Sequence, residues 1–292
     1  MTGGWSGGDY AAAGDAWAHA ADDVTATALA ELGRTATGPA PRVLDVATGT
    51  GPAALAVAGS GASAVGLDRE LGLLQTAAER ARRAGLAATA RFVAGDATEL
   101  PFPAGAFDAV VSTFGVMFAP DARLAAAELI RVCRPGGILA VASWTPDGVM
   151  GRIAPTVTRH LDRPAATPAP TRWGDPRHIR TWFAPLPVVV RTRVAYVRVA
   201  YPSVAHAVAV FENKPGPLRT YRSALRALGR WEDVRADLAA LFGAHNRSTG
   251  ADLVFDAPYL LVLGRVYGPV AGGGPSGRQS DVEAAHRHSR TP

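Results

Sequence analysis

The sequence predicts an α/β fold in which a mostly parallel sheet is covered by helices on both faces. Between residues 42 and 144, short apolar segments with the length of buried strands alternate with segments of helical periodicity. Turns that contain glycine or proline separate these segments, as in βαβ units. The 292 residues suffice for one such domain with a sizeable insertion, and the 48% hydrophobic content is ordinary for a globular protein.

The individual elements follow from the local pattern. Residues 11–33 are Ala-rich with apolar positions at helical spacing, which predicts a first helix that ends at Gly33. The next strands are expected at 42–47, 62–68, 88–96, 107–115 and 138–144, and the next helices at 52–60, 71–85 and 120–133. Asp121 is expected to cap the last of these helices, and R-P-G-G, residues 134–137, is expected to be a turn.

The pattern changes after Trp144. Helices are expected at 148–161 and 175–183, strands at 187–201 and 255–267, and a mostly helical insert at 203–250. We interpret this insert as a substrate lid and the last, aperiodic residues as a disordered tail. The predicted units are an N-terminal helical lid segment (1–34), a ligand-binding core (35–146), the remaining strands with the inserted lid (147–269) and the tail (270–292).

Composition excludes several classes of protein. The lone cysteine, Cys133, excludes an intrachain disulfide, and the N-terminus does not resemble a signal peptide. A run of about 18 apolar residues, as a membrane span requires, does not occur, so we expect a cytoplasmic protein without membrane contact. Residues 172–235 hold eleven arginines against four acidic residues. A solvated surface accounts for this excess, and an acidic or carrier-bound small molecule is the functional alternative. Nucleic acid is not expected, because no recognisable binding module accompanies the charge.

The stretch V-L-D-V-A-T-G-T-G, residues 43–51, leads a predicted buried strand into a tight glycine turn before a helix. Gly49 to Ala54 fits the G-x-G-x-x-A pattern of dinucleotide-binding turns, and Asp68 closes the next strand, where a ribose would need an acid. Asp45, inside the first strand, would repel a phosphate but suits a cationic group such as an α-ammonium. The acid therefore favours S-adenosylmethionine, which has an amino-acid end, over a dinucleotide.

Further polar residues close the next predicted strand. Asp68 can accept hydrogen bonds from both ribose hydroxyls, and Asp96 can accept one from an adenine amino group, beside the backbone N–H of Ala97. Gly49 and Gly51 allow a ligand to approach the backbone closely. All these residues lie at the carboxyl ends of neighbouring parallel strands, where open α/β sheets bind ligands.

Five motifs occur in order along this part of the chain. They are D-V-A-T-G-T-G (45–51), G-L-D (66–68), G-D-A (95–97), L-P-F-P-A-G-A-F-D (100–108) and R-P-G-G (134–137). With them, residues 42–146 resemble class I S-adenosylmethionine-dependent methyltransferases of the small-molecule group that includes the ubiquinone/menaquinone type. Three further motifs resemble a subgroup common in actinobacterial secondary metabolism. They are W-S-G-G-D-Y (5–10), S-T-F-G-V-M-F-A-P-D (112–121) and A-S-W-T-P (142–146).

The resemblance implies a Rossmann-like, mostly parallel seven-stranded sheet under a helical lid, with S-adenosylmethionine as cofactor. It also assigns residues to the amino-acid end of the cofactor, to its ribose and to its adenine. In that order they are Asp45, Ala47, Gly49 and Gly51, then Asp68 and Arg69, then Asp96 and Ala97, with Phe114 near the ligand and Tyr10 closing over it. Ala47 replaces the first glycine of the usual E/D-x-G-x-G-x-G, and since alanine is small, we expect the ligand to fit with a slight shift.

Several of these assignments have a structural alternative. Asp45 and Asp96 could stabilise turns, Asp68 could cap a helix, and Phe114 could be core. Asp108 is expected to be structural and is left out of the site.

The expected reaction is methyl transfer to an oxygen, nitrogen or carbon of a small molecule. The expected acceptor is a secondary metabolite. Such a displacement needs alignment above all, whereas a hydroxyl acceptor also benefits from a base. His206 in the lid is the candidate base, Trp144 is expected to line the substrate pocket, and no metal is expected. Two alternatives stay open: the same fold and cofactor in a non-methylating reaction such as cyclisation, and an NAD(P)-dependent reductase.

Overall fold

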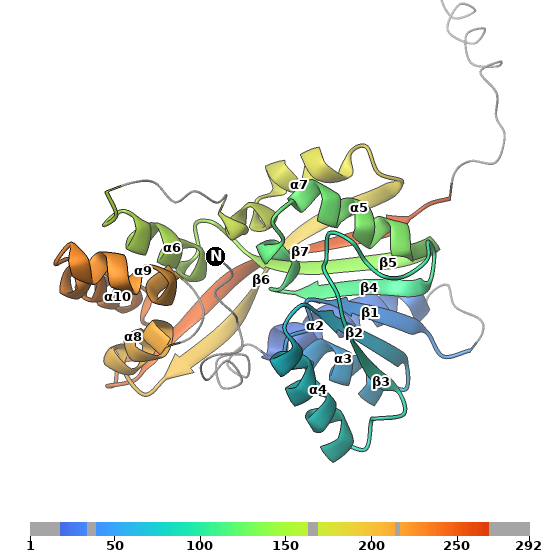
Figure 1. The fold of residues 1–292 in the computed structure, drawn as a ribbon, viewed down its shortest axis with the longest axis horizontal. Helices are drawn as coiled ribbons and strands as arrows, with labels where there is room; N and C mark the ends of the chain where they lie inside the picture. The colour runs from blue at the N-terminus through green and yellow to red at the C-terminus, as the bar shows by residue number, and fades with distance from the viewer. Residues whose placement is uncertain (1–17, 34–38, 163–168, 214–216, 269–292) are drawn as a thin grey trace, which may run out of the picture.

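The computed structural model describes residues 18–33, 39–162, 169–213 and 217–268, and its centre is a seven-stranded sheet (Figure 1). The strand order is β3-β2-β1-β4-β5-β7-β6. The strands β1 to β5 are parallel, whereas β7 pairs antiparallel with β5 and β6, so the predicted fold class is confirmed. The strands are β1 (Arg42–Val46), β2 (Ser63–Asp68), β3 (Ala90–Ala94), β4 (Phe107–Thr113), β5 (Cys133–Trp144), β6 (Val188–Tyr201) and β7 (Leu253–Val266).

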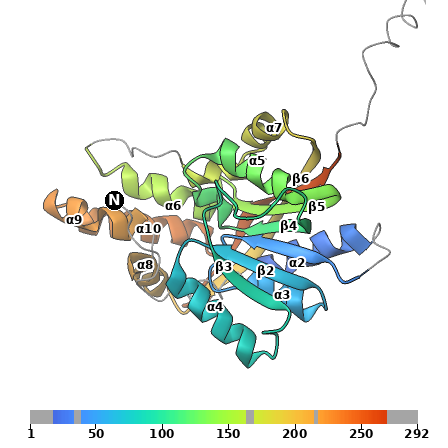
Figure 2. The same cartoon turned by 45° about the vertical axis from the view of Figure 1, so that its right-hand side comes forward.

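Helices cover both faces of the sheet. The helices α2, α3 and α4 lie on one face and α5 and α7 on the other, which Figure 2 shows from a second side. Because both faces are covered, the central strand β4 is apolar and buried over most of its length. The helices are α2 (Ala18–Gly33), α3 (Pro52–Gly59), α4 (Leu71–Arg83), α5 (Ala122–Val132), α6 (Val149–Thr158), α7 (Pro176–Phe183), α8 (Val204–Asn213), α9 (Pro217–Ala227) and α10 (Trp231–His245), with the 3-10 turns η1 (Val116–Phe118) and η2 (Pro170–Gly174).

The strand β5 begins earlier than the sequence pattern predicted. Residues 134–137 were expected to form a turn, but β5 already begins at Cys133, which pairs with Phe107 of β4. The register of the two strands shifts directly after this pair, as at a β-bulge. A Cβ on Gly137 would lie 2.7 Å from a backbone oxygen of β4. Glycine therefore allows a close strand pairing here, where the sequence pattern indicated a turn.

The strands β6 and β7 extend beyond the rest of the sheet and carry the lid helices. Among the described residues, β5 pairs with β7 only as far as Trp144, which lies opposite Tyr259. From there, residues 253–258 of β7 pair with residues 196–201 of β6 as a two-stranded ribbon. The helices α8, α9 and α10 connect the far ends of this ribbon within the predicted insert, 203–250, and lie at one end of the molecule in Figure 1.

Some predicted segments lie outside the described residues. They are the tail at 270–292 and the start of the N-terminal lid segment, which includes Tyr10. Within the described part of the chain, no helix has the length and apolar character needed to cross a membrane.

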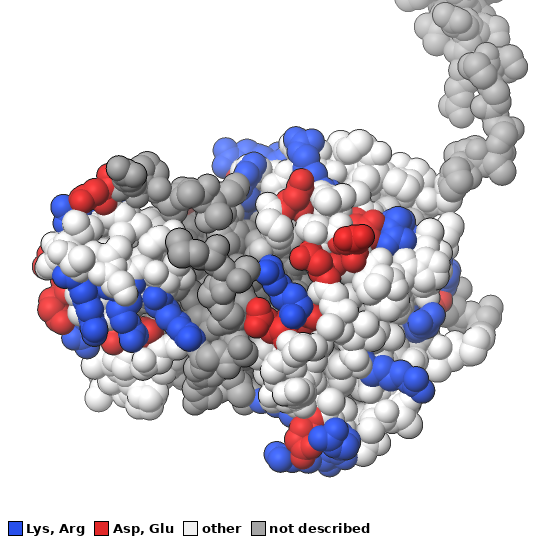
Figure 3. Space-filling view, in the orientation of Figure 1, with Lys and Arg blue, Asp and Glu red and all other residues white. Residues whose placement is uncertain are grey.

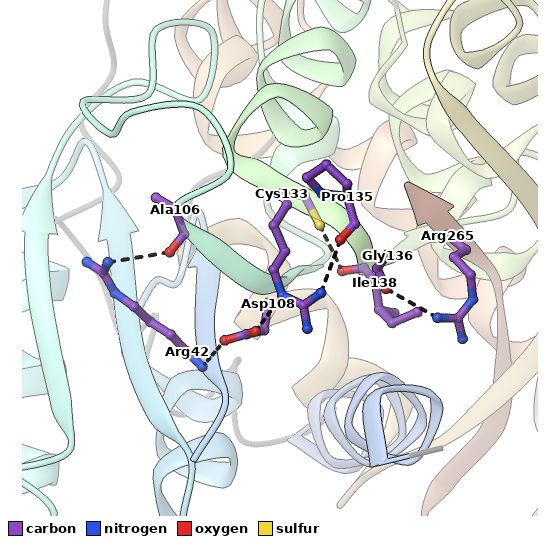
Figure 4. A network of polar contacts seen from close by, with 9 residues as sticks. Arg42, Ala106, Asp108, Cys133, Pro135, Gly136, Ile138 and Arg265 are labelled. Carbon is purple, nitrogen blue, oxygen red and sulfur yellow. Dashed lines mark hydrogen bonds and ion pairs between the residues drawn. The ribbon is translucent and has the colours of Figure 1, made fainter. Parts of the chain in front are cut away.

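A polar network joins strand ends at the edge of the sheet opposite the glycine turn (Figure 4). Asp108, at the start of β4, accepts hydrogen bonds from the backbone N–H of Arg42 at 2.7 Å and from Nε of Arg134 at 2.6 Å. It thereby joins β1, β4 and β5. Arg265 of β7 donates to the carbonyl oxygen of Gly136 at 3.2 Å, which adds a fourth strand. These bonds give Asp108 the structural role that the sequence predicted.

Replacing Asp108 with alanine is expected to lower the free energy of unfolding by about 1–2 kcal/mol, because the Arg42 amide and the Arg134 guanidinium lose their carboxylate partner. Chemical denaturation at pH 7 measures the change. The control Glu99→Ala removes an exposed carboxylate and should alter the same free energy by less than about 0.5 kcal/mol. Equal losses in the two variants would contradict the structural role of Asp108.

Candidate functional site

The turn between β1 and α3 has a left-handed backbone at alternate residues. Gly49 has a φ of 58° and Gly51 a φ of 86°, conformations that glycine adopts without steric cost. Ala47 has a φ of 56°, which is uncommon for a residue with a side chain. Ala47 thus keeps the conformation of the glycine that the resembled family has at this position.

The side chain of Ala47 fits because Gly115, in the loop after β4, has none. A Cβ on Gly115 would lie 2.6 Å from the Cβ of Ala47 and 2.4 Å from its carbonyl oxygen. Real Cβ atoms do not approach so closely, so only glycine at position 115 lets the loop lie against the turn. Sequence reasoning missed this pair, because no local pattern indicates that the two loops touch.

Asp45 is buried beneath the turn and stabilises it. Its Oδ2 accepts hydrogen bonds from the Thr48 hydroxyl at 2.5 Å and from the backbone N–H of Ala54 at 3.2 Å. Burial raises the pKa of this carboxyl to about 7; the two hydrogen bonds oppose the shift, and the neighbouring Asp68 carboxylate adds to it. Asp45 is only 2% exposed, so the structure shows its turn-stabilising role, and a contact with a ligand stays a prediction.

Asp68 links the end of β2 to the glycine turn. Its Oδ2 accepts the N–H of Gly49 at 2.9 Å, and its Oδ1 accepts the N–H of Glu70 at 3.0 Å, just before α4. Burial raises the pKa of Asp68, although these N–H groups oppose the shift. Each carboxylate oxygen keeps a second lone pair, so Asp68 can accept two further hydrogen bonds from hydroxyls that lie side by side. The helix-capping and ligand-binding roles are therefore compatible.

Asp96 follows β3 and is fixed by a local turn. Its Oδ1 accepts hydrogen bonds from the hydroxyl of Thr98 at 2.6 Å and from the Thr98 N–H at 2.8 Å. These bonds lower its pKa, partial burial opposes them, and the nearby positive charge of Arg69 lowers it further. Asp96 is thus ionised, and its Oδ2 accepts no hydrogen bond from the described residues, which leaves it available to a donor on a ligand.

These strand ends line one cleft of about 390 Å³. Its polar wall brings together five of the residues that the sequence assigned to the site. They are Ala47, Asp68, Arg69, Asp96 and Ala97. Asp45, Gly49 and Gly51 do not line this cleft but form the turn next to it.

The other wall was predicted only in part: the sequence offered Trp173 and Trp182 as aromatic residues that could line an apolar pocket, with most such residues expected in the core. It comes from η1, η2 and α7 and includes Arg172, Trp173 and Trp182. The sequence indicated a helix at 175–183 and assigned residues 148–183 to the lid, but nothing local shows how this segment packs on the sheet. The one available signal was the aromatic and arginine content of the segment T-R-W-G-D-P-R.

The structure does not place Phe114 and Trp144 in the wall of this cleft. Their rings stack on each other, with centroids 3.6 Å apart and planes 8° from parallel. Tyr259 meets Phe114 edge to face at 5.6 Å, and both members of the stack are buried. Phe114 is therefore a core residue, which was the structural alternative to a place near the ligand. Its φ is 57°, and the next residue, Gly115, lines the cleft.

His206, the candidate base, lies elsewhere. It is an exposed residue of α8, on the lid ribbon, and it does not line the cleft. Its ring is 6.2 Å from the ring of Tyr201. The structure therefore gives no support to His206 as a base at the cleft.

Comparison with known proteins matches the part of the chain that contains the glycine turn and the polar wall of the cleft. Residues 44–141 match a family model described as a methyltransferase domain. An uncharacterized protein of Mycobacterium bovis, Mb1440c, is 44% identical over 138 residues, which is 47% of this chain and 50% of that protein. A demethylmenaquinone methyltransferase of Renibacterium salmoninarum is 43% identical over 107 residues, 37% of this chain and 43% of that protein. The match thus spans about half the length of these relatives, or less.

The fold has solved counterparts. The crystal structure of the YcgJ protein from Bacillus subtilis has a TM-score of 0.56 and 18% sequence identity, and the match covers 86% of this chain and 99% of that chain. The resemblance to class I S-adenosylmethionine-dependent methyltransferases is confirmed by the matched domain at 44–141, and the sheet has their Rossmann-like topology.

The raised pKa of Asp45 gives a prediction for Asp45→Asn. Between about pH 4 and pH 7 the folded state holds a proton that the unfolded state has lost, so this group stabilises the wild type less as the pH rises. The variant has no such group. From pH 5 to pH 8, its free energy of unfolding should therefore rise relative to wild type by roughly 2–3 kcal/mol. Denaturant unfolding at the two pH values measures this.

Asp108→Asn is the matched control. The pKa of Asp108 is lowered: burial acts against ionisation, but the Arg42 N–H and the Arg134 guanidinium outweigh it. The stabilisation by the Asp108 carboxylate is lost only as the pH falls through the acid range below about 4. The difference in free energy of unfolding between Asp108→Asn and the wild type should therefore be constant from pH 5 to pH 8. Parallel behaviour of Asp45→Asn and Asp108→Asn would show that Asp45 is ionised in the folded protein.

Proposed function

We propose, from the methyltransferase domain matched at residues 44–141, that the protein binds S-adenosylmethionine in the cleft and transfers its methyl group to a small-molecule acceptor. One observation carries the proposal: the carboxylates of Asp68 and Asp96 line the same cleft, beside a glycine turn at the end of β1. Two acids at the ends of adjacent parallel strands match the two polar parts of an adenosine, its ribose and its base.

The residues of the polar wall fit this cofactor. Asp68 has lone pairs for two ribose hydroxyls, and Asp96 has a free Oδ2 for the adenine amino group, with Ala97 beside it. The turn from Ala47 to Gly51 would hold the amino-acid end. Asp45, directly beneath that turn, could gain a negative charge when an ammonium group comes near, since its pKa is about 7.

When bound, S-adenosylmethionine supplies a methyl group on a positively charged sulfur. The acceptor's lone pair forms the new bond to the methyl carbon as the C–S bond breaks. The electron pair of that bond goes to sulfur, and the acceptor gives up a proton if it carries one. The chain's own part is to align the two reactants and to keep water out, and the wall of η1, η2 and α7 lines the part of the cleft where the acceptor would lie.

Charge supports an acidic acceptor, and a secondary metabolite is the class that the sequence motifs favour. Basic side chains gather along the lid, at the left of Figure 3. There α9 contributes Arg219, Arg222 and Arg226 and no acidic residue. A positive lid raises the local concentration of anionic acceptors, whether these are free or tethered to a carrier.

Calorimetric titration with S-adenosylmethionine, S-adenosylhomocysteine and NADH tests the proposal. We expect both adenosyl ligands to bind and NADH not to bind. Asp68→Ala should make the binding free energy of both adenosyl ligands less favourable by about 1–3 kcal/mol, the cost of losing hydrogen bonds to a charged group. Asp108→Ala, which removes a hydrogen-bonded carboxylate at the other end of the sheet, should leave the affinities unchanged.

Three outcomes oppose the proposal. Binding of NADH alone would assign the turn to a dinucleotide. Unfolding of Asp68→Ala in a thermal melt would leave only its helix-capping role. Tight binding of S-adenosylmethionine without release of S-adenosylhomocysteine during turnover of an acceptor would indicate a non-methylating reaction on the same fold.

A further inference from the structure

The cleft has two chemically different walls. The polar wall, from β1, β2 and β3, accounts for the donor. The second wall is apolar and aromatic, and it includes Met117 and Phe118 of η1 together with Trp173 of η2 and Trp182 of α7. Arg172 adds a positive charge at this wall. None of these five residues is used by the proposed binding of the donor.

The two indole rings are held in fixed positions. Trp173 and Trp182 have centroids 5.2 Å apart and planes inclined by 58°. A Cβ on Gly174 would lie 1.9 Å from the carbonyl oxygen of Trp144, so η2 is packed directly on the end of β5. Asp175 caps α7 by accepting the N–H of Arg177 at 2.8 Å. These contacts hold η2 against the end of β5 and fix the start of α7.

Trp173 carries a buried donor that the fold does not use. The residue is 1% exposed, and its Nε1–H has no hydrogen-bond partner among the described residues. An unpaired buried donor is costly, and such groups in native proteins call for an explanation. Trp173 is among the residues that line the cleft, so a shift of the side chains that cover this N–H would let an oxygen atom of a ligand accept its hydrogen bond.

Arg172 supplies a cation next to that donor in the sequence and in the same wall. Its guanidinium carbon lies 5.7 Å from the centroid of the Trp182 ring, a cation–π distance. The carboxylate nearest to it in the sequence, Asp175, pairs instead with Arg177, and no ion pair of Arg172 is found among the described residues. A guanidinium held on an aromatic face and left without a counter-charge is suited to an anionic oxygen.

We infer that this half of the cleft binds the methyl acceptor, and that the acceptor is a flat aromatic molecule carrying an acidic oxygen, as a carboxylate or a phenolate. Its ring would lie against the exposed ring of Phe118 and the edge of Trp182, and its acidic oxygen would be held by Arg172 and by the Trp173 N–H. An oxygen that is already ionised needs no base to activate it. A cationic amine would instead be repelled by Arg172 and Arg69. The inference rests on the proposed function, because it assigns the polar wall to the donor.

The test uses the full chain saturated with S-adenosylhomocysteine and three probes in calorimetric titrations at pH 7. They are 1-hydroxy-2-naphthoate, which is flat and anionic, 1-naphthol, which is flat and neutral, and decanoate, which is anionic and flexible. We expect 1-hydroxy-2-naphthoate to bind at least about tenfold more tightly than either of the others, since only it meets both the aromatic wall and the cation.

Two variants separate the contributions. Arg172→Gln should lower the affinity for 1-hydroxy-2-naphthoate by about tenfold and change the affinity for 1-naphthol by less than about twofold. Trp173→Phe keeps a ring but removes the N–H, and should weaken the anionic probe by about fivefold. The matched controls are Arg180→Gln, an exposed arginine of α7 that does not line the cleft, and Trp231→Phe in the lid. Both should bind as the wild type does.

The outcomes distinguish the two proposals. If S-adenosylhomocysteine itself does not bind, the proposed function falls. If it binds while 1-hydroxy-2-naphthoate binds no better than 1-naphthol, or not at all, the assignment of the acceptor class is overturned and the proposed function stands. If Arg172→Gln and Arg180→Gln weaken the anionic probe equally, the effect is one of overall charge, and the assigned site is also overturned.

Discussion

The hydrogen bond from the Gly49 N–H to the Asp68 carboxylate is the contact on which the site depends. Parallel pairing of β1 and β2 places Val46 opposite Leu67, so the turn after one strand begins beside the acid that ends the other. The Thr48 N–H, which donates to the carbonyl oxygen of Leu67 at 2.9 Å, makes a second link between the same segments. Because these bonds use backbone groups of the turn, the shape of the turn is set without a ligand, and a ligand need not bear the cost of ordering it.

The polar half of the site could be predicted because it follows from local sequence patterns. A buried strand followed by glycines, and then acids that close the next two strands, needs only the rule that parallel strands end at the same edge. That rule places Asp68 and Asp96 together, as the structure does. The same local signals gave the sheet and the cap of α5 at Asp121, which accepts the N–H groups of Arg123 and Leu124.

The aromatic half could be predicted only in part. Trp173 and Trp182 could be named as possible pocket residues, but their position depends on contacts between segments far apart in the chain. The pairing of Ala47 with Gly115, and the fold of η2 back onto β5, leave no periodic pattern in the sequence. Aromatic content alone also misled: Trp144 was expected in a pocket, but it stacks on Phe114 in the interior. His206 illustrates the same limit, since the sequence of the apolar helix α8 does not reveal which of its faces turns toward the cleft.

The ribbon formed by the far halves of β6 and β7 separates the lid helices from the strands whose ends form the cleft. The three lid helices join the sheet through those two strands, and the pairs that hold β7 to β5 begin only at Tyr259. Residues can be inserted, deleted or exchanged among the helices without altering the register of any strand that ends at the cleft. The outer helices can therefore change in length and sequence without disturbing the strands whose ends form the cleft.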